Sequence, residues 1–217
     1  MSASEVADIL AGEEVTLSHI RRAVHHLTKQ TRAVLYDEGS PLHKSAAGGF
    51  FEALVYELLL SASEHASCVQ SIVAKLADAD YISYDKYSSD GLWYSRDGGI
   101  RFKVGGRVAA EIDLLLRTSD GVRVFGEVIT TQSGMKGFQA EIAAKKSLLS
   151  KLYDDPVEFL LVLPVEPQNG LRCVGENDAF VVIPGGDTLY NNVTKSEVIM
   201  RNLSPAKSTK RVNGRIW

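Results

Sequence analysis

The sequence predicts an α/β protein with a central mixed sheet flanked by helices, and two segments carry that prediction. Residues 127–163 have the pattern strand, helix, strand, and the last of these, 157–163, is a continuous apolar run typical of a buried central strand. Such a crossover places its two strands in parallel. Residues 108–117 and 122–131 are rich in β-formers and flank a turn, which predicts an antiparallel hairpin. A sheet that contains both kinds of pair is mixed.

The composition is that of an ordinary globular protein. The chain has 217 residues, of which 45% are apolar and 24% are charged, and its formal net charge is −3. This balance excludes a wholly basic nucleic-acid coat but leaves room for a local basic face. Cys68 and Cys173 stand alone, so we expect no zinc site of the usual spacing.

No apolar run reaches the ~20 residues that a membrane span needs. The first residues also lack the basic region of a secretory signal. Gly98-Gly99 and Gly105-Gly106 precede no predicted helix, which argues against a phosphate-binding loop. We therefore expect a soluble, intracellular protein of the cytoplasm, with no membrane partner and no small organic cofactor.

The remaining elements follow from hydrophobic periodicity and turn residues. Their pattern predicts helices at 16–35, 46–60, 63–77 and 136–153, β-hairpins within 81–107, and a short strand at 179–183. The chain is thereby divided into an N-terminal helical extension at 1–40, an α/β core at 41–200 and a basic C-terminal tail at 201–217. We expect the tail to be loosely held.

Three groups of basic residues are candidates for contact with nucleic-acid phosphates. A solvated surface is the commoner explanation of such groups, and phosphate contact is the alternative. The candidates are Arg21, Arg22, Lys29 and Arg32 on the helix predicted at 16–35, Arg101 and Lys103 among the aromatic residues of 81–107, and Lys207, Lys210 and Arg211 in the tail.

The turn at 119–121 decides which residues of the predicted hairpin oppose each other. Its sequence, Ser-Asp-Gly, suits a three-residue loop whose glycine is left-handed. In that register Asp113 lies opposite Glu127, and both carboxylates project from one face with Cβ atoms about 4.5–5.5 Å apart. A two-residue turn would instead set Asp113 against Val128 and put the carboxylates on opposite faces.

Two opposed carboxylates repel each other and need compensation from a cation, a basic side chain or a shared proton. Oxygen ligands suit Mg²⁺ or Mn²⁺, which also bind phosphate oxygens. A purely structural alternative is an exposed sheet face, or carboxylates that pair with Lys or Arg side chains.

In their order, these segments resemble the core of the PD-(D/E)XK nuclease superfamily, which has a restriction-endonuclease-like fold. The family pattern is a helix that often carries a glutamate, a hairpin with Asp and Glu-x-Lys, then a helix and a buried strand. The resemblance spans 46–163 and is carried by Glu52 in the segment 48–55, by Asp113 in Glu-Ile-Asp, and by Glu127 in Gly-Glu-Val-Ile.

The resemblance implies a restriction-endonuclease-like core within 41–200 and the activity of a metal-dependent DNA endonuclease. It implies that Asp113, Glu127 and the backbone carbonyl of Val128 bind Mg²⁺ or Mn²⁺, and that Glu52 completes the shell directly or through water. Cutting both strands of a duplex normally needs two sites, so the resemblance also implies a homodimer.

The sequence departs from the family at Ile129, which stands where the family has its lysine. Within the family this lysine can come from the next helix, where Lys145 and Lys146 lie, to orient water or stabilise charge on the phosphorane. We favour Lys146, because it shares a side of the helix with Gln139 whereas Lys145 lies nearer the apolar stripe. Lys136 is a third candidate.

Loss of the motif lysine also allows a different function. The chain would then be a nucleic-acid-binding module or subunit on the same fold that no longer cuts. Whether a lysine amine lies near both carboxylates separates these two functions. In a third alternative, the protein is a scaffold whose acids are ordinary surface residues.

Overall fold

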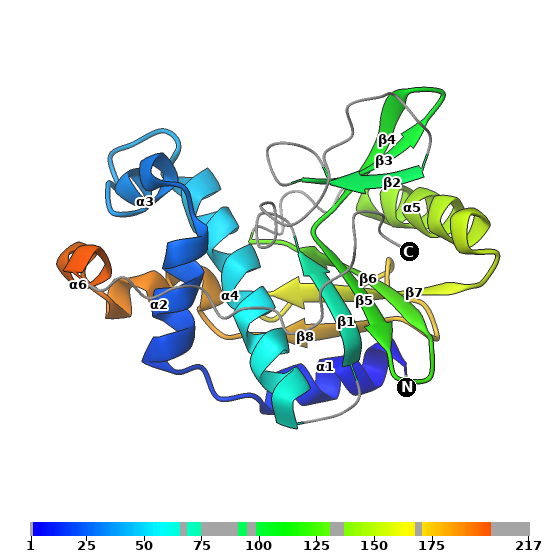
Figure 1. The fold of residues 1–217 in the computed structure, drawn as a ribbon, viewed down its shortest axis with the longest axis horizontal. Helices are drawn as coiled ribbons and strands as arrows, with labels where there is room; N and C mark the ends of the chain where they lie inside the picture. The colour runs from blue at the N-terminus through cyan, green and yellow to red at the C-terminus, as the bar shows by residue number, and fades with distance from the viewer. Residues whose placement is uncertain are drawn as a thin grey trace.

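The computed structural model describes residues 2–65, 69–74, 91–94, 99–130, 137–167 and 171–200 (Figure 1). The helices are α1 (Ala3–Gly12), α2 (Leu17–His26), α3 (Lys29–Leu35), α4 (His43–His65), α5 (Phe138–Tyr153), the 3₁₀ helix η3 (Gly186–Asn192) and α6 (Lys195–Met200). The strands are β1 (Val69–Ala74), β2 (Gly91–Tyr94), β3 (Ile100–Val104), β4 (Arg107–Ile112), β5 (Leu114–Thr118), β6 (Arg123–Val128), β7 (Val157–Leu163) and β8 (Ala179–Val182).

Five strands form a mixed sheet in the order β1-β5-β6-β7-β8. The β1–β5 and β5–β6 pairs are antiparallel, whereas the β6–β7 and β7–β8 pairs are parallel. Helix α5 connects β6 to β7, as the strand–helix–strand pattern predicts. A separate antiparallel sheet has the order β2-β3-β4. The prediction of an α/β protein with a central mixed sheet flanked by helices is confirmed.

Alternate residues of the central strands enter two hydrophobic cores, one on each face of the five-stranded sheet. Leu114 and Leu116 of β5 belong to the first core with residues of α1, α2 and α4. Leu115 and Phe125 belong to the second core with residues of α5. Because side chains alternate along a strand, Glu127 lies on the same face as Phe125, two residues away. Its carboxylate is therefore on the α5 side of the sheet.

A buried ion-pair cluster joins α2 to α4 within the first core. The Glu57 side chain is 1% exposed, and its Oε1 lies 2.6 Å from Nε2 of His26. Its Oε2 lies 3.3 Å from Nε of Arg22. A carboxylate this far from water requires such partners, since an unpaired buried charge costs several kcal/mol.

We expect Glu57→Ala to lower the free energy of unfolding by about 3 kcal/mol, because it breaks a buried pair and leaves a cavity. Urea denaturation measures this change. The control is Glu64→Ala on the same helix, where Glu64 is exposed and where we expect less than about 0.5 kcal/mol. Equal losses in the two variants would show that the cluster contributes little to stability.

The helix predicted at 16–35 is two helices, α2 and α3. Thr28 lies between them with extended backbone, and its hydroxyl accepts a hydrogen bond from the Thr31 N–H at 3.1 Å. A new N-cap therefore interrupts the helical pattern.

The helix predicted at 63–77 is wrong. Helix α4 continues to His65, and the Ser63 hydroxyl donates to the Leu60 carbonyl at 2.7 Å within it instead of capping a new helix. The next described residues form strand β1, whose β-branched residues pair with β5.

The strand predicted at 108–117 is interrupted at Asp113. Strand β4 ends at Ile112 in the three-stranded sheet, and β5 begins at Leu114 in the five-stranded sheet. Asp113 therefore lies at the junction of the two sheets.

Strands β2 and β3 lie within 81–107, as predicted, but the tyrosines at 81, 84 and 87 and the tail at 201–217 lie outside the described residues. Over the described ranges, no helix is both long and apolar enough to cross a membrane.

Candidate active site

The β5–β6 hairpin has the register that its turn predicts. Gly121 has a φ of +91°, and its N–H donates to the Thr118 carbonyl at 3.0 Å. The Thr118 N–H donates to the Val122 carbonyl at 2.9 Å, and the ladder then runs back to Leu114 opposite Gly126. The prediction of a three-residue loop is confirmed. The same register, continued one step beyond the ladder, sets Asp113 of the bend between β4 and β5 against Glu127, as the sequence predicts.

Each carboxylate is held by a specific contact. Oδ2 of Asp113 accepts a hydrogen bond from the Val128 N–H at 3.0 Å, which fixes it beside the end of β6. Glu127 is buried, and its Oε1 lies 2.8 Å from Nζ of Lys145 on α5. The same Nζ lies 2.8 Å from Oε1 of Glu141, one helical turn earlier. Two carboxylates, Glu127 and Glu141, therefore hold one buried ammonium group.

Burial and the nearby negative charge of Asp113 together raise the pKa of Glu127 from 4.5 to about 8, although the Lys145 ammonium opposes this shift. Burial by itself would lower the pKa of Lys145, but Glu127 and Glu141 outweigh it, so the pKa of the ammonium is raised. Lys145 is therefore a fixed cation, and the pKa of Glu127 stays above that of an ordinary carboxyl group in spite of this cation.

The raised pKa of Glu127 predicts that the metal-free protein loses stability as the pH rises. A carboxyl group whose pKa is higher in the folded state stabilises the fold when protonated. That contribution is complete below about pH 4.5 and is lost as the pH rises through about 8. Thermal unfolding in EDTA should show this decline between those values for the wild type and a flatter profile for Glu127→Gln. Parallel profiles for the two proteins would show that Glu127 ionises normally.

The structure reverses our order of preference for the two helix lysines. Nζ of Lys146 lies 2.6 Å from Oδ1 of Asp178, a buried carboxylate that also accepts from the backbone N–H groups of Phe159 and Gly175. Lys145, which lies nearer the apolar stripe, turns towards the sheet and reaches Glu127. The preference for Lys146 is thus wrong on geometry, and Lys136 lies outside the described residues.

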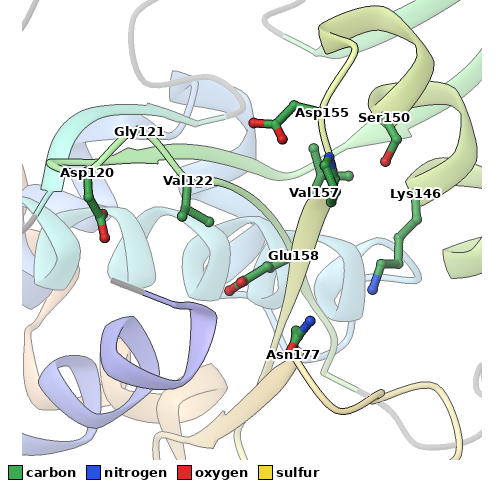
Figure 2. Close-up of a pocket in the computed structure, with 10 residues that line it drawn as sticks. Asp120, Gly121, Val122, Lys146, Ser150, Asp155, Val157, Glu158 and Asn177 are labelled. Carbon is green, nitrogen blue, oxygen red and sulfur yellow. The ribbon is translucent and has the colours of Figure 1, made fainter.

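Lys146 lines a polar cavity of about 400 Å³ (Figure 2). The cavity lies between the β5–β6 turn at Gly121 and the start of β7 at Val157. Glu127 pairs with Leu161, further along β7. The Lys146 side chain is therefore directed towards the other end of this strand from the carboxylate pair.

The remaining predicted ligands have mixed placements. Glu52 is half-buried on α4, which packs in the first core, on the face of the sheet opposite α5. Val128 follows Glu127 directly. Ile129 packs against the second core, and its side chain supplies no charge in place of the family's lysine. Within the described ranges, no group of three or more His, Cys, Asp or Glu residues is arranged to hold a metal ion. A metal at this site would therefore rest on the Asp113–Glu127 pair.

Several of the predicted phosphate-contacting residues are engaged within the protein. Arg21 pairs with Glu197 at 3.2 Å, Arg22 with Glu57 at 3.3 Å, and Arg101 with Glu111 at 2.9 Å. Nη1 of Arg32 lies 3.3 Å from Nδ1 of His25, and Lys29 is exposed on α3. Lys103 is half-buried on β3, and the three candidates of the tail lie outside the described residues.

Two residues of functional interest were not predicted from the sequence. Glu141 precedes Lys145 by four residues, a spacing at which a helix brings opposite charges together, so this pair was visible in the sequence. Asp178 binds Lys146 across a long sequence separation, and no local pattern indicates that contact.

No family model, curated protein or solved structure matches this chain.

Proposed function

We propose that the protein is a metal-dependent DNA endonuclease with a restriction-endonuclease-like core. The order α4, β5, β6, α5, β7 supports this, because it matches the resemblance in the sequence: a helix with a glutamate, a hairpin with Asp and Glu, a helix and a buried strand. Strands β1 to β4 lie between α4 and this hairpin in the chain. The observation that carries the proposal is the 2.8 Å contact between Lys145 and Glu127 beside Asp113.

The donor set fits a magnesium ion. Mg²⁺ is commonly bound by one or two carboxylates together with substrate phosphates, and Asp113 and Glu127 supply two carboxylates at one point. Burial and mutual repulsion raise the pKa of Glu127, which is the penalty that a bound cation would remove. Mg²⁺ or Mn²⁺ would be held by Asp113, Glu127 and the Val128 carbonyl. A bound ion supplies Lewis-acid polarisation of the phosphate and a more acidic water.

Lys145 takes the role that Ile129 cannot. Hydrolysis forms a bond from a water oxygen to phosphorus and breaks the bond to one ester oxygen, and negative charge grows on the phosphoryl oxygens. A fixed ammonium stabilises that charge without reorganising. Glu127 and Glu141 hold Lys145 in place from two sides. Glu141 acts through Lys145 and is therefore a positioning residue.

The alternative is a binding module on the same fold that no longer cuts. A site without a lysine near the carboxylates would favour that alternative, and the position of Lys145 favours the enzyme. Glu52 remains a proposed ligand, directly or through water.

Cleavage of supercoiled plasmid and of labelled duplex oligonucleotides tests the proposal. We expect cutting with Mg²⁺ or Mn²⁺ and none with EDTA. The same assay with single-stranded DNA and with RNA identifies the substrate. Binding of DNA without cutting, under every metal condition, would decide for the binding module.

A further inference from the structure

The tip of the β3–β4 hairpin, residues 104–109, is exposed along its whole length. Val104 and Val108, four residues apart across the turn, are each 49% exposed. Among the described residues, β2 begins at Gly91 and pairs with β3 as far as Lys103, and the tip extends beyond that pair as a two-stranded ribbon of β3 and β4. In Figure 1 this hairpin projects from the body at the upper right of the view. Such a projection indicates a contact surface.

The tip and the adjoining half-buried Lys103 together present a valine and a basic side chain on each face of the hairpin. Val104 pairs with Arg107, and Lys103 pairs with Val108. Cross-strand partners project from the same face, so each face presents one valine and one cation. The turn consists of Gly105 and Gly106, with φ values of +58° and +74°, and has no side chains to widen it.

Charge identifies the partner as an anion. Strands β3 and β4 contain the basic residues Arg101, Lys103 and Arg107 against the single acid Glu111, in a chain whose net charge is −3. No acid lies between Arg101 and Ala110, so nothing on the tip itself repels phosphate groups.

The tip is also joined directly to the candidate active site. Strand β4 runs from Arg107 to Ile112, and the next residue is Asp113. Six residues of extended strand span about 20 Å. That length is less than one turn of duplex DNA, about 34 Å, so DNA bound at Asp113 has a groove within reach of the tip.

We propose that the hairpin tip enters the major groove of duplex DNA next to the phosphate cleaved at the carboxylates, an inference that rests on the proposed nuclease function. The major groove is about 12 Å wide and admits a two-stranded ribbon, whereas the minor groove is about 6 Å wide. Val104 and Val108 contact thymine methyl groups, which are the apolar feature of the major groove. Lys103 and Arg107 contact the phosphates at its walls.

The experiment compares two duplexes that differ only in thymine methyl groups. One is a short A·T-rich duplex, and in the other uracil replaces every thymine. Fluorescence anisotropy in EDTA measures binding while both duplexes stay intact. We expect the wild type to bind the thymine duplex about tenfold more tightly, and Val104→Ala/Val108→Ala to bind both equally. Equal binding of both duplexes by the wild type would overturn the proposal.

Charge at the tip is tested by the salt dependence of binding. Arg107→Gln should flatten the slope of log affinity against log salt by roughly 0.9 for the lost phosphate contact. Matched controls are Lys195→Gln on α6 and Leu42→Ala before α4, both of which are exposed. Helix α6 lies at the far left of Figure 1, away from the hairpin. Controls that lower affinity as much as the tip variants would overturn the proposal.

Two further outcomes separate the possible failures. If Val104→Ala/Val108→Ala converts a dimer into a monomer in sedimentation velocity and leaves DNA affinity unchanged, the tip binds a second copy and the DNA proposal is wrong. If the wild type cuts plasmid, and the tip variants bind DNA and prefer the thymine duplex as the wild type does, only the tip proposal fails. If the wild type neither binds nor cuts DNA, the proposed function fails together with it.

Discussion

Replacing Lys145 with alanine is expected to lower the rate constant of DNA cleavage by about a thousandfold, the usual cost of removing one preorganised charge-stabilising donor. Lys145 is 5% exposed and lies 2.8 Å from carboxylate oxygens of both Glu127 and Glu141. Alanine leaves those acids without their cation and leaves no replacement at Ile129. Single-turnover cleavage at saturating Mg²⁺ measures the chemical step separately from binding.

Lys146→Ala is the matched control for this experiment. The two lysines are adjacent on α5, but Lys146 pairs with Asp178 beside the polar cavity at the start of β7. We expect this variant to cut close to the wild-type rate. If Lys146→Ala loses cleavage and Lys145→Ala keeps it, the lysine assignment is wrong even where the nuclease assignment holds.

A third variant separates the positioning of the Lys145 ammonium from its charge. Glu141→Gln removes one of the two carboxylates that hold Lys145, but leaves the ammonium and Glu127 in place. We expect a smaller loss of the cleavage rate than for Lys145→Ala, because Glu141 is itself largely exposed and an i,i+4 pair contributes only about 0.5 kcal/mol. Losses of equal size would place Glu141 in contact with the substrate rather than behind Lys145.

The parts of the site that local chemistry determines were predictable from the sequence. The turn at 119–121 requires a left-handed residue, and Gly121 supplies it with a φ of +91°. Once the loop length is set, strand periodicity fixes the register as far as Leu114 opposite Gly126 and predicts Asp113 opposite Glu127 without any tertiary information. The parallel β6–β7 pair follows equally from the length of the connecting helix.

The choice between the two lysines was not predictable from a helical wheel. Proximity to the apolar stripe counted against Lys145, yet that proximity turns its stem towards the sheet. A lysine stem is apolar and packs readily in such a place, provided that its ammonium finds a carboxylate. Glu127 is that carboxylate, and it belongs to a different element. A prediction that treats the wheel in isolation therefore misses the partner.

The prediction of a helix where the structure has strand β1 was wrong for a related reason. Residues 69–74 contain apolar positions that suit a helix or a strand, and their pairing with β5 is set by residues far along the chain. The bend at Asp113 is similar, because β4 continues into a second sheet that only tertiary structure defines. Predictions from short segments are weakest where the structure of a segment depends on pairing with strands that are distant in the sequence.

Asp113→Asn is expected to abolish metal-dependent cleavage while the fold stays intact. The asparagine side-chain oxygen can still accept the hydrogen bond from the Val128 N–H, which is 3.0 Å from Oδ2 of Asp113. The negative charge is lost, and with it one of the two carboxylates that we propose bind the metal. We expect a decrease in rate of at least about a thousandfold, because an ion that stabilises transition-state charge contributes several kcal/mol. Plasmid cleavage over a range of Mg²⁺ concentrations measures this loss.

The same substitution has a second consequence that does not depend on catalysis. The negative charge of Asp113 contributes to the raised pKa of Glu127, so its removal should lower that pKa from about 8. The loss of stability in EDTA should then begin at a lower pH than in the wild type. Asp155→Asn is the matched control, since Asp155 is largely exposed and pairs with Arg123 at the other end of β6. A pH profile in Asp113→Asn identical to that of Asp155→Asn would show that the two site carboxylates do not interact.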